Sequence, residues 1–258
     1  MTKEDRHLSY SQINTYMTCP LKYRFSYIDR LEPDFTPSAL HFGQAVHSCI
    51  QAFLQSVLEA DPLRADQLVD IYRQEWRRNE GPPVRYSKRE SEESLFNTAK
   101  QVFTIFTEQH DPAIEVVAVE EEFMIDLTKV SDQCPADLPP LKGYVDAILK
   151  NGSTVLVDYK TSSRKPNGDV NSMQLVAYSL AAVDLGYDPN EIEYRYDYLL
   201  KTAKPELVSC PVAIKDYDRT RFLKTTTGVW RAMQAAIFYP NPSYLCTSCA
   251  YQRHCNEW

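Results

Sequence analysis

GYVDAILKNGSTVLVDYKT, residues 143–161, decides the core of the fold and the placement of its chemistry. Two short runs rich in β-branched and apolar residues flank an Asn-Gly pair, which is typical of a β-hairpin turn. Successive side chains of the run VLVDYK alternate between the two faces of the second strand, so Asp158 and Lys160 share one face while Tyr159 points to the other. Asp146 lies on the first strand. We therefore expect a hairpin that carries two carboxylates and a lysine.

The length of the turn decides whether the two carboxylates can act together. A two-residue Asn-Gly loop would pair Asp146 with Val157 and send Asp146 to the face opposite Asp158. A three-residue loop over 150–152, with Gly152 left-handed as a bulge, would place both carboxylates on one face. A shared site therefore predicts an odd-numbered loop.

Two carboxylates and a lysine in one place suit the metal-dependent cleavage of phosphodiester bonds. Carboxylate oxygens are hard ligands for Mg²⁺ or Mn²⁺. A bound metal lowers the pKa of its water and neutralises charge on the phosphate, and lysine adds a further positive charge. Asp and Lys at this spacing are also common on solvated hairpin faces, so the surrounding motifs must decide.

Composition limits the classes of function. The chain has 258 residues, 43% hydrophobic and 24% charged, which suits one large soluble domain. Only seven glycines occur, and the sequence contains neither GxxxxGK[ST] nor GxGxxG. A net charge of −7 does not favour nucleic-acid binding by the chain as a whole, but two segments, 21–30 and 72–89, mix basic and aromatic residues. Solvated helix faces explain these two segments equally well.

No apolar run approaches the roughly 20 residues of a membrane span, and the first ten residues lack the apolar region of a secretion signal. We therefore expect a cytoplasmic protein with no membrane partner.

Periodicity predicts a helical N-terminal part, a β-rich centre and a short Cys-rich tail. Ser9 and Gln12 resemble a capping box that opens a first helix, which Pro20 interrupts. Further helices are expected at 43–59, 65–79, 91–109, about 170–185 and about 216–238. Strands are expected at 114–126, 141–149, 154–160, 192–200 and 206–212, with a loop over 128–140.

Three of the seven cysteines form Cys-x2-Cys-x5-Cys in the tail, at positions 246, 249 and 255. A metal or cluster site needs a fourth ligand, and the candidates are His254 and the distant Cys19. His254 would favour zinc, whereas Cys19 would give an all-thiolate site for zinc or an iron–sulfur cluster. The isolated cysteines are expected to be small buried residues; they are Cys49, Cys134 and Cys210.

Six motifs, in this order along the chain, resemble those of RecB-like nucleases of the PD-(D/E)XK superfamily. The resemblance is to the iron–sulfur branch that includes AddB and the CRISPR-associated RecB-like exonucleases. LSYSQINTYMTCPLKYRFSYI carries a first cysteine, HFGQAVHSCI matches GxxxH, GYVDAI matches GxxD, VDYKT matches (D/E)xK, QLVAY matches QxxxY and CTSCAYQRHC supplies the last cysteines. The matching residues are Cys19, Gly43, His47, Asp146, Asp158, Lys160, Gln174, Tyr178, Cys246, Cys249 and Cys255.

The resemblance implies an α/β (α+β) restriction-endonuclease-like fold, in which helices flank a central mixed β-sheet. The whole chain, 1–258, would form one nuclease domain, with a mainly helical part at 1–112, a catalytic β-core at 113–212 and a C-terminal helix and cluster-binding tail at 213–258. The four cysteines at 19, 246, 249 and 255 would hold a structural 4Fe–4S cluster, with structural zinc as the alternative. No helicase motif is present, so a helicase or recombination partner would be a separate protein.

The implied activity is that of a metal-dependent DNA exonuclease acting on single-stranded ends, in DNA repair, recombination or phage- or CRISPR-related processing. Asp146, Asp158, His47 and the carbonyl of Tyr159 would hold Mn²⁺ or Mg²⁺, and the imidazole favours Mn²⁺. Lys160 would orient or deprotonate the attacking water.

Gln174 and Tyr178 lie four residues apart, so they share a helix face and would position substrate or water, unless they serve only helix–sheet packing. Relatives often carry an acidic residue near Glu120, but Glu121 and Glu122 are equally near, so none of the three joins the expected site. The alternatives to an exonuclease are a structure-specific endonuclease and a non-catalytic nucleic-acid-binding subunit of a helicase–nuclease complex.

Overall fold

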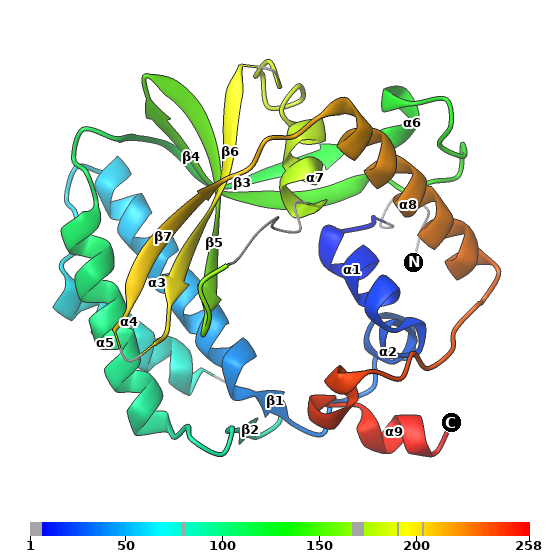
Figure 1. Ribbon diagram of the computed structural model, residues 1–258, viewed down its shortest axis with the longest axis horizontal. Helices are drawn as coiled ribbons and strands as arrows, with labels where there is room; N and C mark the ends of the chain where they lie inside the picture. Colours follow the sequence, from blue (N-terminus) through cyan, green and yellow to red (C-terminus); the bar gives the residue numbers. More distant parts are fainter. Residues whose placement is uncertain (1–6, 79–80, 167–172, 190, 203) are drawn as a thin grey trace.

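A five-stranded mixed sheet forms the centre of the protein (Figure 1), in the order β3-β4-β5-β6-β7. This computed structural model describes residues 7–78, 81–166, 173–189, 191–202 and 204–258. Strands β5 and β6 pair in parallel, and the other neighbours pair antiparallel. The strands span Glu115–Ile125 (β3), Leu141–Asn151 (β4), Ser153–Ser162 (β5), Ile192–Leu200 (β6) and Glu206–Pro211 (β7). The α/β class expected from the sequence is confirmed.

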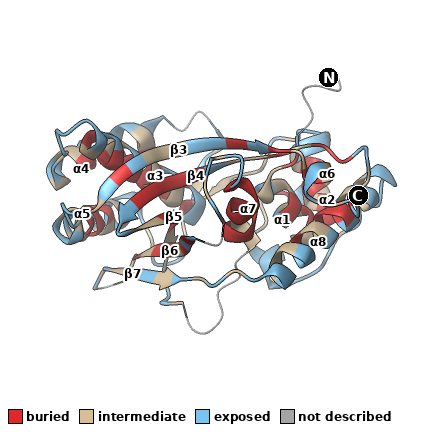
Figure 2. Ribbon diagram, turned by 90° about the horizontal axis from the view of Figure 1, so that it is seen from above, coloured by how far each residue is buried: buried red, intermediate tan, exposed pale blue. Residues whose placement is uncertain are grey.

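Helices cover both faces of this sheet and divide its apolar contacts into two cores (Figure 2). One core lies under α3 (Ser38–Leu58), α4 (Ala65–Arg77) and α5 (Glu92–Gln109). The other lies under α1 (Tyr10–Thr18), α7 (Met173–Ala181) and α8 (Asp216–Gln234). Helix α7 lies between β5 and β6 in the chain, within the crossover that a parallel pair requires.

The N-terminal helix begins and breaks as its sequence predicts. Ser9 and Gln12 form the reciprocal capping box at the start of α1. Pro20 then occupies the first turn of α2 (Pro20–Tyr23), where its missing N–H costs no helical hydrogen bond. A π-helical turn, η2 (Arg24–Ile28), follows. The break orients Cys19 toward the other end of the chain, where η3 (Tyr244–Ser248) and α9 (Gln252–Asn256) lie.

The hairpin has the odd register that a shared site requires. Asn151 pairs with Ser153, and Gly152 alone stands between them with φ of +75°. The left-handed glycine is confirmed. The loop is shorter than the expected 150–152, because Lys150 pairs with Thr154 and Asn151 with Ser153, which leaves Gly152 alone outside the ladder. The ladder pairs Ala147 with Val157, and one further step in this register brings Asp146 opposite Asp158.

One glycine beside the hairpin is required by a close approach. A Cβ on Gly143 would lie 2.5 Å from the ring of Phe123 on β3, a distance that real structures do not show. The glycine of GxxD therefore allows an aromatic ring of the neighbouring strand to lie flat over β4, three residues from Asp146.

Several details differ from the expectations. The segment expected to be a loop begins with a helical turn, α6 (Leu127–Val130), capped by Asp126. A two-residue parallel pair, β1 (Thr36–Pro37) with β2 (Val84–Arg85), was not expected. The helix start expected at about 170 lies outside the described residues; α7 is described from Met173, and the last long helix ends at Gln234.

The remaining expectations concern single residues and membrane spans. Cys49 and Cys134 are buried as expected, but Cys210 is only half-buried because it lies on the edge strand β7. In the basic segment 72–89 the aromatic Tyr72 and Trp76 are buried, and residues 79–80 lie outside the described part. Within the described residues, no helix has the length and apolarity needed to cross a membrane.

Candidate active site

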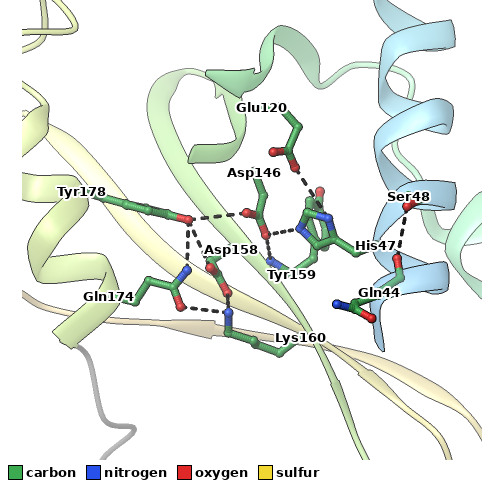
Figure 3. A network of polar contacts seen from close by, with 10 residues as sticks. All are labelled: Gln44, His47, Ser48, Glu120, Asp146, Asp158, Tyr159, Lys160, Gln174 and Tyr178. Carbon is green, nitrogen blue, oxygen red and sulfur yellow. Dashed lines mark hydrogen bonds and ion pairs between the residues drawn. The ribbon is translucent and has the colours of Figure 1, made fainter. Parts of the chain in front are cut away.

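The site lies where β4 and β5 diverge. Their ladder ends at Ala147 and Val157, so the N–H of Tyr159 has no backbone partner on β4. Asp146 accepts this N–H through Oδ2 at 2.8 Å. A carboxylate thus replaces a ladder carbonyl at the end of the hairpin, and its position is fixed by the backbone of the next strand (Figure 3).

Helices from both faces of the sheet reach Asp146. Nε2 of His47, on α3, lies 2.9 Å from Oδ2 of Asp146. The hydroxyl of Tyr178, on α7, lies 3.4 Å from Oδ1. Asp146 is 9% exposed, so these contacts are made out of bulk water, where charge interactions are strong. The inward-facing histidine expected from GxxxH is therefore in contact with the hairpin.

Asp158 and Lys160 form the second half of the site. Asp158 is completely buried, and its Oδ2 lies 2.6 Å from Nζ of Lys160. Lys160 also donates to Oε1 of Gln174 at 2.9 Å, and Nε2 of Gln174 donates to the Tyr178 hydroxyl at 3.3 Å. That hydroxyl lies 3.1 Å from Oδ1 of Asp158. Gln174 and Tyr178 thus contact the charged groups directly and do more than pack a helix on a sheet.

Glu120 belongs to the site although the sequence did not single it out. The β3–β4 register pairs Val119 with Ala147 and Glu121 with Val145, which places Glu120 opposite Asp146. Its backbone has a φ of +52°, a left-handed conformation that is rare for glutamate and clusters at functional sites. Ligand atoms of His47, Glu120 and Asp146 all lie within 4.8 Å of one another.

The neighbours of Glu120 do not share this position. The carboxylate of Glu122 instead accepts a hydrogen bond from the Tyr144 hydroxyl and forms an ion pair with Lys142 at 2.9 Å. Glu120 could have been identified through its position opposite Asp146 in the β3–β4 pairing. That register cannot be read from the sequence, because residues 126–140 separate the two strands.

Burial and like charges disturb the protonation of the cluster. Burial raises the pKa of Asp158, and the charge of Asp146 raises it further against the opposing effect of Lys160. Burial also raises the pKa of Glu120, although His47 opposes this. Burial alone would lower the pKa of His47, but its hydrogen bond to Asp146 and the surrounding carboxylates outweigh burial and leave that pKa raised. The carboxylate of Asp146 is therefore close enough to those of Asp158 and Glu120 to repel them when all are charged.

Clefts open on both sides of this cluster. One, of about 520 Å³, lies between the first half of α3 and the end of β5 and includes His47 and Lys160 among its walls. The other, of about 480 Å³, lies between the start of α1, β4 and α7 and includes Gln174 and Tyr178. His47 and Lys160 thus line one cleft, Gln174 and Tyr178 line the other, and each cleft is large enough for a small ligand.

The four cysteines that the resemblance singles out come together from the two ends of the chain. Cys19, Cys249 and Cys255 pack around a small core of Leu21, Phe25 and Tyr251. All seven cysteines are free. The pKa of Cys255 is raised first by burial and then by Cys19, Cys249 and Cys246, which places Cys19 among the tail cysteines. His254 instead contacts the carbonyl of Glu32 at 3.4 Å.

Comparisons with known proteins agree with this geometry. The family described as the PD-(D/E)XK nuclease superfamily matches residues 7–256. The Gene 69 protein of Mycobacterium phage L5 is 24% identical over 272 residues, covering 91% of this chain and 90% of that protein. The Gene 69 protein of Mycobacterium phage D29 is 26% identical over 266 residues, with coverage of 91% and 90%.

A solved structure also resembles this chain. It is a provisionally named exonuclease from Eubacterium rectale, with a TM-score of 0.55 and 13% identity, and the match covers 98% of this chain and 90% of that one. At this identity the likeness concerns the fold alone.

Proposed function

Because this chain belongs to the PD-(D/E)XK nuclease superfamily, we propose that it is a DNA exonuclease that digests single-stranded ends with Mn²⁺ or Mg²⁺. The observation that carries the proposal is the convergence of His47, Glu120 and Asp146 beside the Asp158–Lys160 pair. The sequence relatives in two mycobacteriophages favour phage DNA processing as the setting.

The donor atoms fit a divalent ion. Oε1 of Glu120 is buried and accepts no hydrogen bond, and its charged neighbour, Nδ1 of His47, lies 3.6 Å away. A buried carboxylate oxygen without a hydrogen bond is costly unless a cation satisfies it. Two carboxylates with one imidazole suit Mn²⁺ better than a wholly oxygen-based set would. We include Asp158 and the carbonyl of Tyr159 as further ligands, because Asp158 lies opposite Asp146 in the register and the backbone N–H of Tyr159 donates to Asp146.

A bound divalent ion supplies Lewis-acid chemistry to the scissile phosphate. The residues of the chain then have distinct tasks. Lys160, held between Asp158 and Gln174, presents its ammonium to the phosphate oxygens and orients the attacking water. Tyr178 links the two aspartates through its hydroxyl and keeps them at a fixed separation. Gln174 accepts from Lys160 and gives its ammonium a second anchor beside Asp158.

We propose further that Cys19, Cys246, Cys249 and Cys255 hold a structural 4Fe–4S cluster, as in the iron–sulfur branch of RecB-like nucleases. Thiolates in an apolar surrounding are the ligands such clusters use. The same four thiolates would also suit a tetrahedral zinc, and the metal content of the purified protein distinguishes the two.

Anaerobically purified protein, incubated with end-labelled single- and double-stranded DNA and either metal, tests the nuclease proposal. We expect digestion of linear single strands, and loss of digestion in Lys160→Ala. Lys165→Ala is the matched control, because this neighbouring lysine is exposed and pairs with Glu206 at 3.5 Å, away from the carboxylates of the site. Undiminished cleavage by Lys160→Ala would refute the assignment.

Two further readouts separate the alternatives. Cleavage of closed circular single-stranded DNA would identify an endonuclease, and binding without cleavage would identify a non-catalytic subunit. Iron and sulfide analysis of the same sample tests the cluster, since a colourless protein with stoichiometric zinc would replace it. A helicase that supplies single strands would be a separate partner.

A further inference from the structure

The 520 Å³ cleft beside α3 has chemistry that the proposed metal site does not use. Its walls include Leu40, Gln44, His47, Lys160, Thr161 and Leu199. Leu40, Gln44 and His47 follow one another at helical spacing, so they form one stripe along α3 that ends at the metal-binding group. Figure 3 shows Gln44 and His47 projecting from the same helix toward the strands. We call this space the α3 cleft.

The floor of the α3 cleft is closed by a tight contact between helix and strand. A Cβ on Gly43 would lie 3.3 Å from Oγ1 of Thr161, so α3 approaches β5 nearly to van der Waals contact there. Leu40 stands above this contact and is 53% exposed, although it borders a buried site. Gln44 is exposed as well, and among the described residues its side-chain amide has no hydrogen bond, whereas its backbone carbonyl accepts from Ser48. An apolar side chain and an amide thus face the same space.

Charge is distributed unevenly along the cleft. The inner end carries Lys160 and the metal-binding group, which together suit a phosphate. The outer end carries Leu40 and Gln44, which offer exposed apolar surface and one hydrogen-bonding amide but no charge. A phosphate at the inner end therefore leaves its attached nucleoside facing uncharged walls. An uncharged ring system with polar edges is the partner that such walls accommodate.

We infer that the α3 cleft binds the nucleoside attached to the scissile phosphate, with Leu40 packing on its base and Gln44 hydrogen-bonding to the polar edge of that base. This inference rests on the proposed function, since it places the substrate of the same site. Leu40 and Gln44 position the substrate and take no part in the bond cleavage itself.

Substrates that lack one base test this assignment. A single abasic nucleotide is moved through each position of a labelled single strand, and kcat/KM is measured for the wild type, Leu40→Ala and Gln44→Ala. On intact DNA we expect each variant to lose about 2- to 10-fold in kcat/KM, the range of one neutral hydrogen bond or one packed contact. At one abasic position the wild type should lose a similar factor, and the variants should lose little more. Such non-additivity shows contact between the side chain and the missing base.

Matched controls lie on the same helix. Leu58→Ala removes another exposed leucine, 45% exposed, and Gln55→Ala removes an exposed glutamine, both more than two turns beyond His47. Both should match the wild type on every substrate. Additive losses at all abasic positions, or wild-type rates in Leu40→Ala and Gln44→Ala, would overturn the inference.

Failure of the proposed function has a separate signature. If the wild type binds single-stranded DNA but does not cleave it, the proposed function fails, and the same abasic series measured as Kd by fluorescence anisotropy decides the inference. If the wild type neither binds nor cleaves, both are overturned.

Discussion

The polar cluster at the end of the hairpin and the cysteine cluster at the chain termini are stabilised in different ways. The polar cluster lies on a five-stranded sheet between two large apolar cores, and its side chains bind one another. The cysteine cluster lies among short helical turns around only three buried residues, Leu21, Phe25 and Tyr251. The first arrangement is held by contacts among its own side chains, whereas for the second we propose that a bound cluster supplies the stability that so small a core lacks. The comparison predicts that changes in the first affect activity, and changes in the second affect folding.

The largest effect is expected from Asp158→Asn. This change removes a buried charge that contacts Lys160 and Tyr178, so activity should fall by about 1,000-fold or more. The thermal midpoint should stay the same or rise, because burial of a carboxylate carries a cost that burial of an amide of the same shape avoids. Steady-state cleavage assays and thermal unfolding of one preparation check both. A large fall in the thermal midpoint would show that Asp158 is needed for the fold.

Cys19→Ser should have the opposite profile. Loss of the bound group should remove protection from hydrogen exchange in 20–28 and 252–256, while β4 and β5 remain protected. Cys49→Ser is the matched control, because Cys49 is buried under α4, far in sequence from the termini. Hydrogen-exchange mass spectrometry checks this prediction. Unchanged protection at both termini would show that the cysteines do not stabilise this region.

Glu120→Gln tests whether the residue that sequence inspection left out is a metal ligand. We expect Mn²⁺ affinity to fall by about 10- to 100-fold, with the fold intact. Glu121→Gln changes the neighbouring residue, whose pairing partner is Val145, and should bind Mn²⁺ as the wild type does. Calorimetric titration of the two variants makes the comparison. Equal affinities would remove Glu120 from the ligand set.

His47 should titrate above the usual pKa of histidine in the metal-free protein. Its raised pKa means that protonated His47 contributes stability that is fully present below the unfolded-state pKa and is lost as pH rises through the folded-state pKa. Metal binding needs the neutral imidazole, so Mg²⁺ affinity should increase with pH over the same interval. NMR titration of the imidazole checks this, and Glu120→Gln should lower the midpoint by removing one neighbouring charge. A midpoint below that of free histidine would contradict the geometry.

The smallest effects are expected from two glycines. Gly143→Ala would place a Cβ against the ring of Phe123 and should destabilise the protein by about 1–3 kcal/mol. Gly228→Ala, within α8, meets no atom within 4 Å and should stabilise it by about 0.5–1 kcal/mol through helix propensity. Denaturant unfolding of the pair gives both values. Equal stabilities would show that the sheet relaxes around Gly143.

Much of the fold could be predicted from the sequence, because its signals are local. The capping box at Ser9, the break at Pro20 and the apolar run before Asp158 each act within a few residues. The same holds for Gly152, whose left-handed conformation follows from the turn itself. Helix and strand positions therefore agree with the expected ranges to within a few residues, apart from α6 and the short β1–β2 pair.

The site could be predicted only in part, because it depends on registers between distant segments. Asp146 and Asp158 lie in one hairpin, so their relation could be worked out from turn length. Glu120 is brought to them by the β3–β4 pairing, which a connection of fifteen residues separates from any local signal. The contact of Gln174 with Lys160 likewise depends on how α7 packs over the sheet.

The single residue at the tip of the hairpin also limits how this gene can change in length. Adding or deleting one codon between Asp146 and Asp158 would exchange the inward and outward faces of one strand, unless a bulge absorbed it. Adding or deleting two would lengthen or shorten the hairpin and keep both carboxylates on the same side. Viable insertions in this hairpin are therefore expected to come in even numbers of residues, because these keep Asp146 and Asp158 on the same side.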